Sequence, residues 1–233
     1  MEPLILGLET ATTAFAVGLS RGAHLIAHTE VFLDKHHARL IAVGVQQLLE
    51  YLELKPNDLD AVAVSAGPGS YTGLRIGMAA AKGFCLALGK PLITVGTLEA
   101  MAATLRYEAQ RRQTCIIPLL DARRMEVYTA TYSANGEELA PPAAAIVERT
   151  WLEGLNARGS ALLLGDGLTK CLPLLEGLDN LIPYPEMKPG VEGLLHRAGL
   201  RYALGQFSDV ATTEPLYLKP PATTEPRKRQ SFV

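Results

Sequence analysis

The chain has 233 residues, of which 48% are hydrophobic and 20% charged, and a formal net charge of −2. This composition is typical of a globular protein with one large or two small domains, and it excludes a disordered or fibrous chain. A charge so close to zero gives no general attraction to nucleic acid or to an anionic membrane, so any such contact has to be local.

The sequence predicts a cytoplasmic protein without membrane contact. Its first residues lack the basic and long apolar parts of a signal peptide, and no run approaches the roughly 20 apolar residues of a membrane span. The three cysteines stand far apart in apolar surroundings. They therefore indicate neither a disulfide framework nor a metal site, and we expect no metal ligands.

The first part of the chain predicts a β-meander and a helix. Two short apolar runs, residues 4–9 and 14–19, are joined by a polar turn and indicate a hairpin, and residues 25–32 supply a third antiparallel strand. From residue 36 to residue 52, apolar side chains recur at helical spacing, with Asp34 as the expected cap.

A glycine-rich turn follows the next strand. Residues 61–66 form a continuous apolar run of the kind that is buried on both faces of a sheet, and it leads into Gly67-Pro68-Gly69-Ser70-Tyr71-Thr72-Gly73. Such a turn before a helix can present N–H groups to an anion, but Leu74 stands where a P-loop has lysine, which excludes a P-loop NTPase. Two interpretations stay open: an anion site, or a tight turn whose glycines let strand and helix approach closely.

The helix predicted over residues 74–88 is apolar almost all round, with Arg75 and Lys82 as its charged residues. It must be covered on a second side, either by the rest of the chain or by a partner. A strip of small residues is available for close packing, namely Gly73, Gly77, Ala80 and Ala81, and Gly44 offers a similar notch on the preceding helix. A protein interface and an ordinary buried helix are both compatible with this pattern.

The second part of the chain repeats the opening pattern. After a strand at residues 91–95, a helix from 97 to 105 with Thr97 as its cap, and a charged boundary at 106–113, residues 115–120 and 126–132 form a second hairpin. An acidic residue, Glu9 or Asp121, ends the first strand of each hairpin. We therefore expect two related lobes, residues 1–105 and 106–233. The second also holds a strand at 162–164, helices at 170–175 and 193–204, and a mobile basic tail from residue 220.

The run Val64-Ser65-Ala66-Gly67-Pro68-Gly69-Ser70-Tyr71-Thr72-Gly73-Leu74-Arg75-Ile76-Gly77, continued by Ala81-Lys82-Gly83, resembles the bacterial TsaB (YeaZ) family. These proteins work in making threonylcarbamoyladenosine (t6A) on tRNA. Five further segments are similar to the family: residues 5–10, 97–100, 121–128, 165–167 and 215–218. The resemblance thus covers most of the chain.

This resemblance implies a two-lobed α/β fold of the actin/Hsp70/sugar-kinase (ASKHA) type, in which each lobe opens with a β-hairpin and has a mixed sheet packed by helices. Family members do not catalyse the transfer. They pair with TsaD, the related subunit that carries the metal and transfers threonylcarbamoyl to adenosine, and the assembly recruits the ATPase TsaE and meets tRNA indirectly. Without TsaD, we expect a homodimer.

The family interface is formed by the two helices of the N-terminal lobe, here residues 36–52 and 74–88. The resemblance places the partner interface at His37, Leu40, Ile41, Gly44, Gly73, Gly77, Ala80, Ala81 and Phe84. It predicts a non-catalytic subunit that stabilises and positions TsaD, with no catalytic residue of its own.

The superfamily usually has aspartate at the tip of the first hairpin, where this chain has Glu9. The longer side chain disfavours magnesium–nucleotide geometry, so we expect no tightly bound cofactor, and ATP or ADP with magnesium only at an interface shared within the complex. The candidate cofactor residues are Glu9, Asp121, Gly67 and Gly69. They also define the alternative function, a stand-alone ATP-dependent phosphotransferase or ATPase. A glycoprotease-like activity would rest only on relatedness to TsaD.

Overall fold

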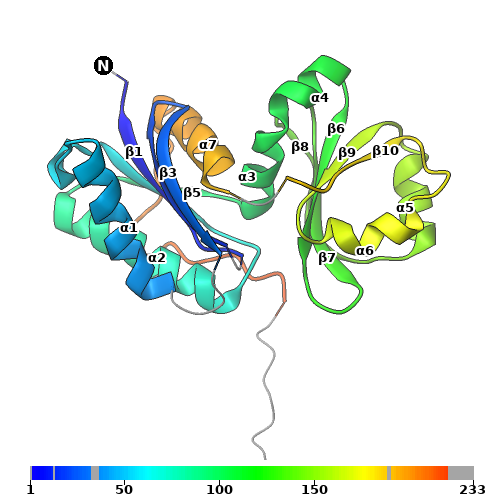
Figure 1. Ribbon diagram of the computed structural model, residues 1–233, viewed down its shortest axis with the longest axis horizontal. Coiled ribbons are helices and arrows are strands. Elements are labelled where there is room, and N and C mark those ends of the chain that lie inside the picture. Colours follow the sequence, from blue (N-terminus) through cyan, green and yellow to red (C-terminus); the bar gives the residue numbers. More distant parts are fainter. Residues whose placement is uncertain (1, 13, 33–36, 188–189, 220–233) are drawn as a thin grey trace, which may run out of the picture.

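A computed structural model describes residues 2–12, 14–32, 37–187 and 190–219 (Figure 1). These residues form two five-stranded sheets. The first has the strand order β3-β2-β1-β4-β5, from β1 (Leu4–Glu9), β2 (Ala14–Arg21), β3 (His24–Phe32), β4 (Ala61–Ser65) and β5 (Leu92–Val95). The second has the order β8-β7-β6-β9-β10, from β6 (Cys115–Asp121), β7 (Glu126–Tyr132), β8 (Glu138–Ile146), β9 (Ala161–Leu164) and β10 (Leu181–Tyr184).

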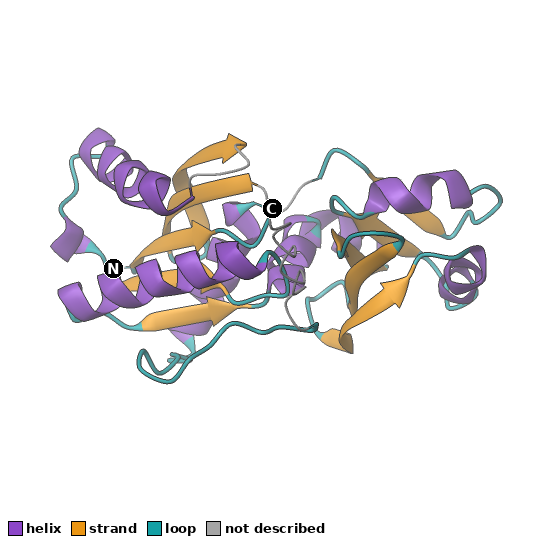
Figure 2. Ribbon diagram, turned by 90° about the horizontal axis from the view of Figure 1, so that it is seen from below, coloured by secondary structure: helices purple, strands orange, loops and turns teal. Residues whose placement is uncertain are grey.

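The two sheets have the same topology. In each, the first three strands form an antiparallel meander, and the last two strands run parallel to the first. The two halves lie side by side along the long axis of the molecule, each with strands flanked by helices (Figure 2). The predicted hairpins, the parallel strand at 61–66 and the internal repeat are confirmed.

The central strand β1 is buried on both of its faces. Leu4, Leu6 and Leu8 pack beneath α1 (His37–Tyr51) and α2 (Tyr71–Leu88), which cover one side of the first sheet. Ile5 points to the other side, where α7 (Val191–Ala203) covers the sheet. This double cover explains why β1 has no polar residue from Leu4 to Leu8, rather than an alternating pattern.

The second sheet is covered in the same way. α3 (Thr97–Thr104) packs on one side, while α5 (Arg149–Asn156) and α6 (Leu168–Cys171) pack on the other. α4 (Arg106–Arg112) follows α3, and short 3-10 helices occupy Pro56–Asp58 and Leu172–Leu174. None of the helices in these described ranges is long and apolar enough to cross a membrane.

Two helices cross between the halves. α3 follows the first sheet in sequence but packs on the second, whereas α7 follows the second sheet and packs on the first, and the two lie against each other between the sheets (Figure 1). The Glu99 carboxylate of α3 joins them through ion pairs of 2.6 Å to both Arg197 and Arg201 of α7. The sequence assigned residues 106–233 to the second lobe, whereas α7, which lies within that range, packs its apolar face on the first sheet.

Several predicted details of the helices change. The helix expected from residue 74 begins at Tyr71, because Ser70 is its N-cap and its Oγ accepts a hydrogen bond from the N–H of Gly73. Thr97 does not cap α3: Gly96 occupies the cap position, and the buried Oγ1 of Thr97 has no partner among the described atoms. The predicted Asp34 cap and the tail from residue 220 lie outside the described residues.

The α2 helix is pressed against the turn between β1 and β2. A Cβ atom on Gly73 would overlap the carbonyl oxygen of Thr10, and one on Gly77 would overlap Oγ1 of the same threonine. That Oγ1 donates a 2.8 Å hydrogen bond to the carbonyl of Gly73. Gly83, on the exposed side of α2, has open space where its Cβ would stand.

The two glycine environments predict opposite effects of the same substitution. Gly77→Ala should destabilise the protein by about 1–3 kcal/mol, because the added methyl group pushes α2 away from Thr10. Gly83→Ala should stabilise it by about 0.5–1 kcal/mol, because alanine favours helix and meets no neighbour. Urea unfolding of both variants beside the wild type measures the difference. Equal effects of the two substitutions would contradict this packing.

Candidate functional site

The glycine-rich turn between β4 and α2 is filled by the chain itself. Gly67 has a φ of +104°, and a Cβ there would overlap the carbonyl of Leu216, while one on Gly69 would overlap the carbonyl of Ala11. The N–H of Ser70 donates to that Ala11 carbonyl at 2.7 Å, and the N–H of Leu216 donates to the carbonyl of Ala66 at 2.7 Å. These contacts support the tight-turn interpretation of the glycines over the anion site.

The small residues expected at the partner interface also face the inside of the molecule. A Cβ on Gly44 would lie 2.9 Å from Val17 of the first sheet, and Gly73 and Gly77 contact Thr10 as described above. Ile41 and Ala81 are fully buried in the core beneath α1 and α2. In this structure the first sheet and the turn after β1 cover these five residues.

The remaining predicted interface residues lie nearer the surface. Leu40, Ala80 and Phe84 are half-buried, and the side chain of His37 lies outside the described part of the chain. Two large aliphatic side chains of the same helices that the interface prediction did not name are exposed, Val43 to 43% and Leu86 to 75%. The surface of α1 and α2 is thus partly apolar, although its small-residue strip is not.

Glu9 ends β1 and is enclosed by protein. Its Oε1 accepts a 2.7 Å hydrogen bond from the N–H of Ala11, and the hydroxyl of Ser65 donates to its Oε2. Burial disfavours the charged form and raises the pKa of Glu9 to about 7, although both hydrogen bonds act in the opposite direction.

Asp121 ends β6 and is more exposed than Glu9. Its Oδ1 accepts hydrogen bonds from the N–H of Arg123 at 2.5 Å and from the ammonium of Lys170 at 2.7 Å. Its own N–H donates to Oδ1 of Asp166 at 2.8 Å, and burial raises the pKa of that second carboxyl above its usual value. The charge of Asp121 is thus already balanced by Lys170.

These two carboxylates do not fit a magnesium–nucleotide site. Both oxygens of Glu9 are bonded inside the protein, and Asp121 is paired with a lysine. Across the described residues, no group of three or more His, Cys, Asp or Glu side chains is placed to hold a metal ion. The described structure therefore gives no support to the alternative in which Glu9 and Asp121 hold magnesium beside a nucleotide.

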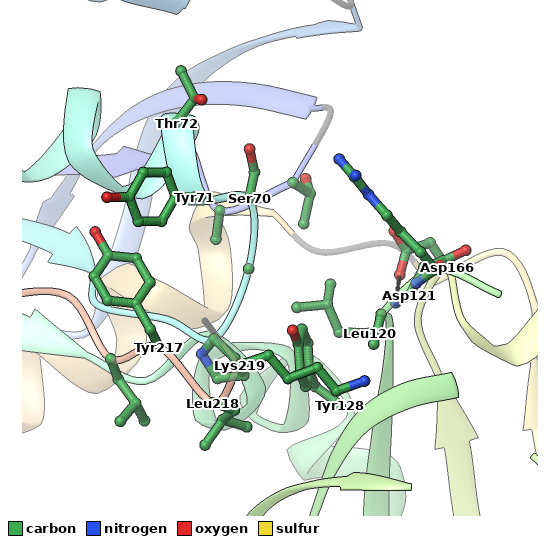
Figure 3. Close-up of a pocket in the computed structure, with 17 residues that line it drawn as sticks. Ser70, Tyr71, Thr72, Leu120, Asp121, Tyr128, Asp166, Tyr217, Leu218 and Lys219 are labelled. Atoms are coloured by element: carbon green, nitrogen blue, oxygen red, sulfur yellow. Dashed lines mark hydrogen bonds between the residues drawn. The ribbon is translucent and has the colours of Figure 1, made fainter. Parts of the chain in front are cut away.

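A cavity of about 680 Å³ opens between the two halves (Figure 3). Its wall comes from the β1–β2 turn, the start of α2, the β6–β7 turn, the Asp166 loop and the segment after residue 215. Tyr71 and Tyr217 lie together on one side with their ring centroids 4.9 Å apart, and Asp121 and Asp166 lie on the other. Of the four candidate cofactor residues, Gly69 and Asp121 line this cavity, whereas Glu9 and Gly67 do not.

The sequence did not single out the cationic and aromatic residues of this wall. They are Tyr71, Arg123, Tyr128, Tyr217 and Lys219. Four of them stand in segments similar to the TsaB family, in the glycine-rich run and in residues 121–128 and 215–218, but the similarity gave them no role. Their shared location follows only from the fold.

The raised pKa of Glu9 predicts a pH-dependent stability. Between its ordinary pKa of 4.5 and about 7, the unfolded chain releases this proton while the folded protein keeps it, so stability falls as pH rises through that window. The loss reaches about 3 kcal/mol at most. Glu9→Gln keeps the acceptor for Ala11, cannot ionise, and should be more stable than the wild type at pH 8 but not at pH 4.5. Parallel pH dependence of the two proteins in urea unfolding would contradict this.

Comparisons with known proteins support the family seen in the sequence. A family model described as "TsaD: tRNA N6-adenosine threonylcarbamoyltransferase" matches residues 31–161. The tRNA threonylcarbamoyladenosine biosynthesis protein TsaB of Bacillus subtilis is 35% identical over 68% of this chain and 69% of its own length. The Escherichia coli protein of the same name is 31% identical over 92% of this chain and 94% of its own.

Solved structures agree. YeaZ from Pseudomonas aeruginosa superposes with a TM-score of 0.72 at 25% identity, over 93% of this chain and all of the other. An inorganic polyphosphate/ATP-glucomannokinase from Arthrobacter shares the fold alone, with a TM-score of 0.51 at 14% identity over 87% and 99% of the two chains. The predicted two-lobed ASKHA fold is therefore confirmed, and the chain belongs to the TsaB (YeaZ) family of tRNA threonylcarbamoyladenosine biosynthesis proteins.

Proposed function

We propose that this protein is a non-catalytic subunit of the cytoplasmic complex that synthesises t6A on tRNA, and that it stabilises and positions a TsaD-type transferase. Family membership supports the pathway. One observation supports the non-catalytic role: the acidic residues that end the two equivalent strands are both engaged within the chain, Glu9 by Ser65 and Ala11 and Asp121 by Lys170. For that reason we do not propose a stand-alone ATPase or phosphotransferase.

The outer surface of α1 and α2 is the proposed docking site for the transferase. It presents the exposed apolar side chains of Val43 and Leu86, together with the half-buried Leu40, Ala80 and Phe84. Exposed apolar side chains on neighbouring helices favour association with another protein surface. A homodimer through the same surface is the proposed state when the transferase is absent.

The other partners are proposed to act through the transferase. The TsaE-type ATPase and the tRNA would join the assembled complex, and ATP or ADP with magnesium would bind at an interface shared between subunits. This arrangement is compatible with a chain whose described residues hold no cluster of metal ligands.

A variant that tests the docking site must change an exposed side chain of α1 or α2 and leave the core intact. Gly44→Leu and Gly77→Leu are unsuitable, because both side chains would enter the chain's own core. Val43→Glu places a charge on the 43% exposed position of α1 and should leave the fold intact. A matched control is Leu139→Glu on β8 of the other half, where the leucine is 57% exposed.

We expect Val43→Glu to weaken binding to a purified TsaD-type subunit by at least about tenfold, because the charge must be desolvated in an apolar contact. It should also convert a homodimer to a monomer. Leu139→Glu should change neither property. Calorimetric titration measures the affinity for the transferase subunit, and sedimentation measures the oligomeric state. If Val43→Glu binds the transferase with wild-type affinity, the docking site does not lie on the outer surface of α1 and α2. If the wild-type chain does not bind the transferase at all, the proposed function itself is overturned.

A further inference from the structure

The last described residues run along the wall of the cavity between the halves. The segment from Leu216 to Lys219 lines this cavity (Figure 3). Its start is held by the N–H of Leu216, which donates to the carbonyl of Ala66, and its end by an ion pair between Lys219 and Glu126. The carbonyl of Glu126 in turn accepts a 2.9 Å hydrogen bond from the ammonium of Lys170. Residues 220–233 therefore follow from a point on the cavity wall.

Two charged side chains of the same wall have no ion pair. Among the ion pairs that the described residues form, none includes Arg123 or Asp166, although both residues line the cavity. Asp121 holds them close together, because its carboxylate accepts a hydrogen bond from the N–H of Arg123 and its own N–H donates to Oδ1 of Asp166. Burial raises the pKa of Asp166, so a cation beside it would stabilise the ionised form. The wall thus presents a cation and a carboxyl group side by side.

The sequence beyond Lys219 contains the complementary charges. Its acidic residue is Glu225 and its first basic residue is Arg227, with Pro226 between them. In an extended segment, side chains two positions apart point to the same side, about 6.6 Å from each other. The residue before a proline favours this extended conformation. Glu225 and Arg227 are therefore spaced to meet two opposite charges that lie next to each other.

The segment is long enough to return to this wall. Glu225 and Arg227 follow Lys219 by six and eight residues, so they reach at most about 20 Å and 26 Å from it. Because Lys170 bonds both Asp121 and the residue that pairs with Lys219, the start of the segment lies close to the two unpaired charges. A short tether gives an effective concentration on the order of millimolar, so weak ion pairs are sufficient to hold the segment.

We propose that residues 220–229 of this chain fold back into the cavity, with the Glu225 carboxylate on Arg123 and the Arg227 guanidinium on Asp166. The segment then takes up space that any other occupant of the cavity would have to displace. The contact lies within one chain, so it does not depend on the proposed pairing with a transferase.

The first test is trypsin digestion of the full chain, with mass spectrometry following cleavage after Arg227. A docked segment is cleaved only while it is released, so the rate of cleavage follows the released fraction. We expect cleavage to be about threefold to tenfold slower than in a synthetic peptide of residues 216–233, as for one or two weak ion pairs. Arg123→Gln and Asp166→Asn should each raise the rate towards that of the peptide.

Each of these variants has a matched control. Arg124→Gln controls for Arg123→Gln, since Arg124 lies in the same turn at a φ of +51° but does not line the cavity. Asp179→Asn controls for Asp166→Asn, since Asp179 is exposed and also lies outside the cavity wall. Neither control should change the rate of cleavage after Arg227.

The second test exchanges the charges of one pair. Arg123→Glu alone should raise the rate of cleavage, and the added change Glu225→Arg should restore the slow rate without creating a trypsin site, because Pro226 follows. The proposal is overturned if the wild-type segment is cleaved as fast as the peptide, if Arg123→Gln and Arg124→Gln have the same effect, or if the exchange does not restore protection. It is also overturned if protection increases with protein concentration, because the segment would then dock on a second copy.

Discussion

The turn after β1 and the first two turns of α2 meet backbone to backbone, and this contact fixes the first half of the molecule. Gly69, Gly73 and Gly77 each lack the side chain that would otherwise overlap Thr10 or Ala11. Close approach lets Ser70 donate to the Ala11 carbonyl and Thr10 donate to the Gly73 carbonyl. A side chain at any of the three glycines would lift α2 off β1. The long glycine motif therefore has a full explanation in packing, without a phosphate in the turn.

The same hairpin design has opposite outcomes in the two halves. In each, an acidic residue at the end of the first strand accepts a hydrogen bond from the N–H two residues on, Glu9 from Ala11 and Asp121 from Arg123. In the first half, the glycine turn at residues 67–69 leads into the 18-residue α2. In the second half, the glycine turn at residues 165–167 leads into the four-residue α6. Glu9 is enclosed and its pKa is raised, while Asp121 lines the cavity beside a lysine.

Local patterns were sufficient to predict the hairpins, the buried strand before the glycine turn, and the repeat, because each depends on neighbouring residues. The exchange of α3 and α7 depends on contacts about 100 residues apart, such as Glu99 with Arg197, and no local pattern encodes it. β8 was not predicted because it contains Pro141 and Pro142, which an edge strand tolerates where its pairing with β7 is irregular. For the glycines of α2, the sequence indicated close packing, but it could not show that the neighbour is Thr10 in the turn after β1.

The cavity was unpredictable for the same reason, since its wall joins segments from five parts of the chain. α2 connects this cavity to the proposed docking surface, because its first residues line one and its outer side forms part of the other. A ligand can change the affinity of a partner only if it binds two states of the connecting element differently. Gly73 and Gly77 pack α2 closely against Thr10, so a shift of α2 by itself would break this contact. Any coupling between the two sites would therefore require the halves to move about α3 and α7, against the ion pairs that Glu99 makes with Arg197 and Arg201.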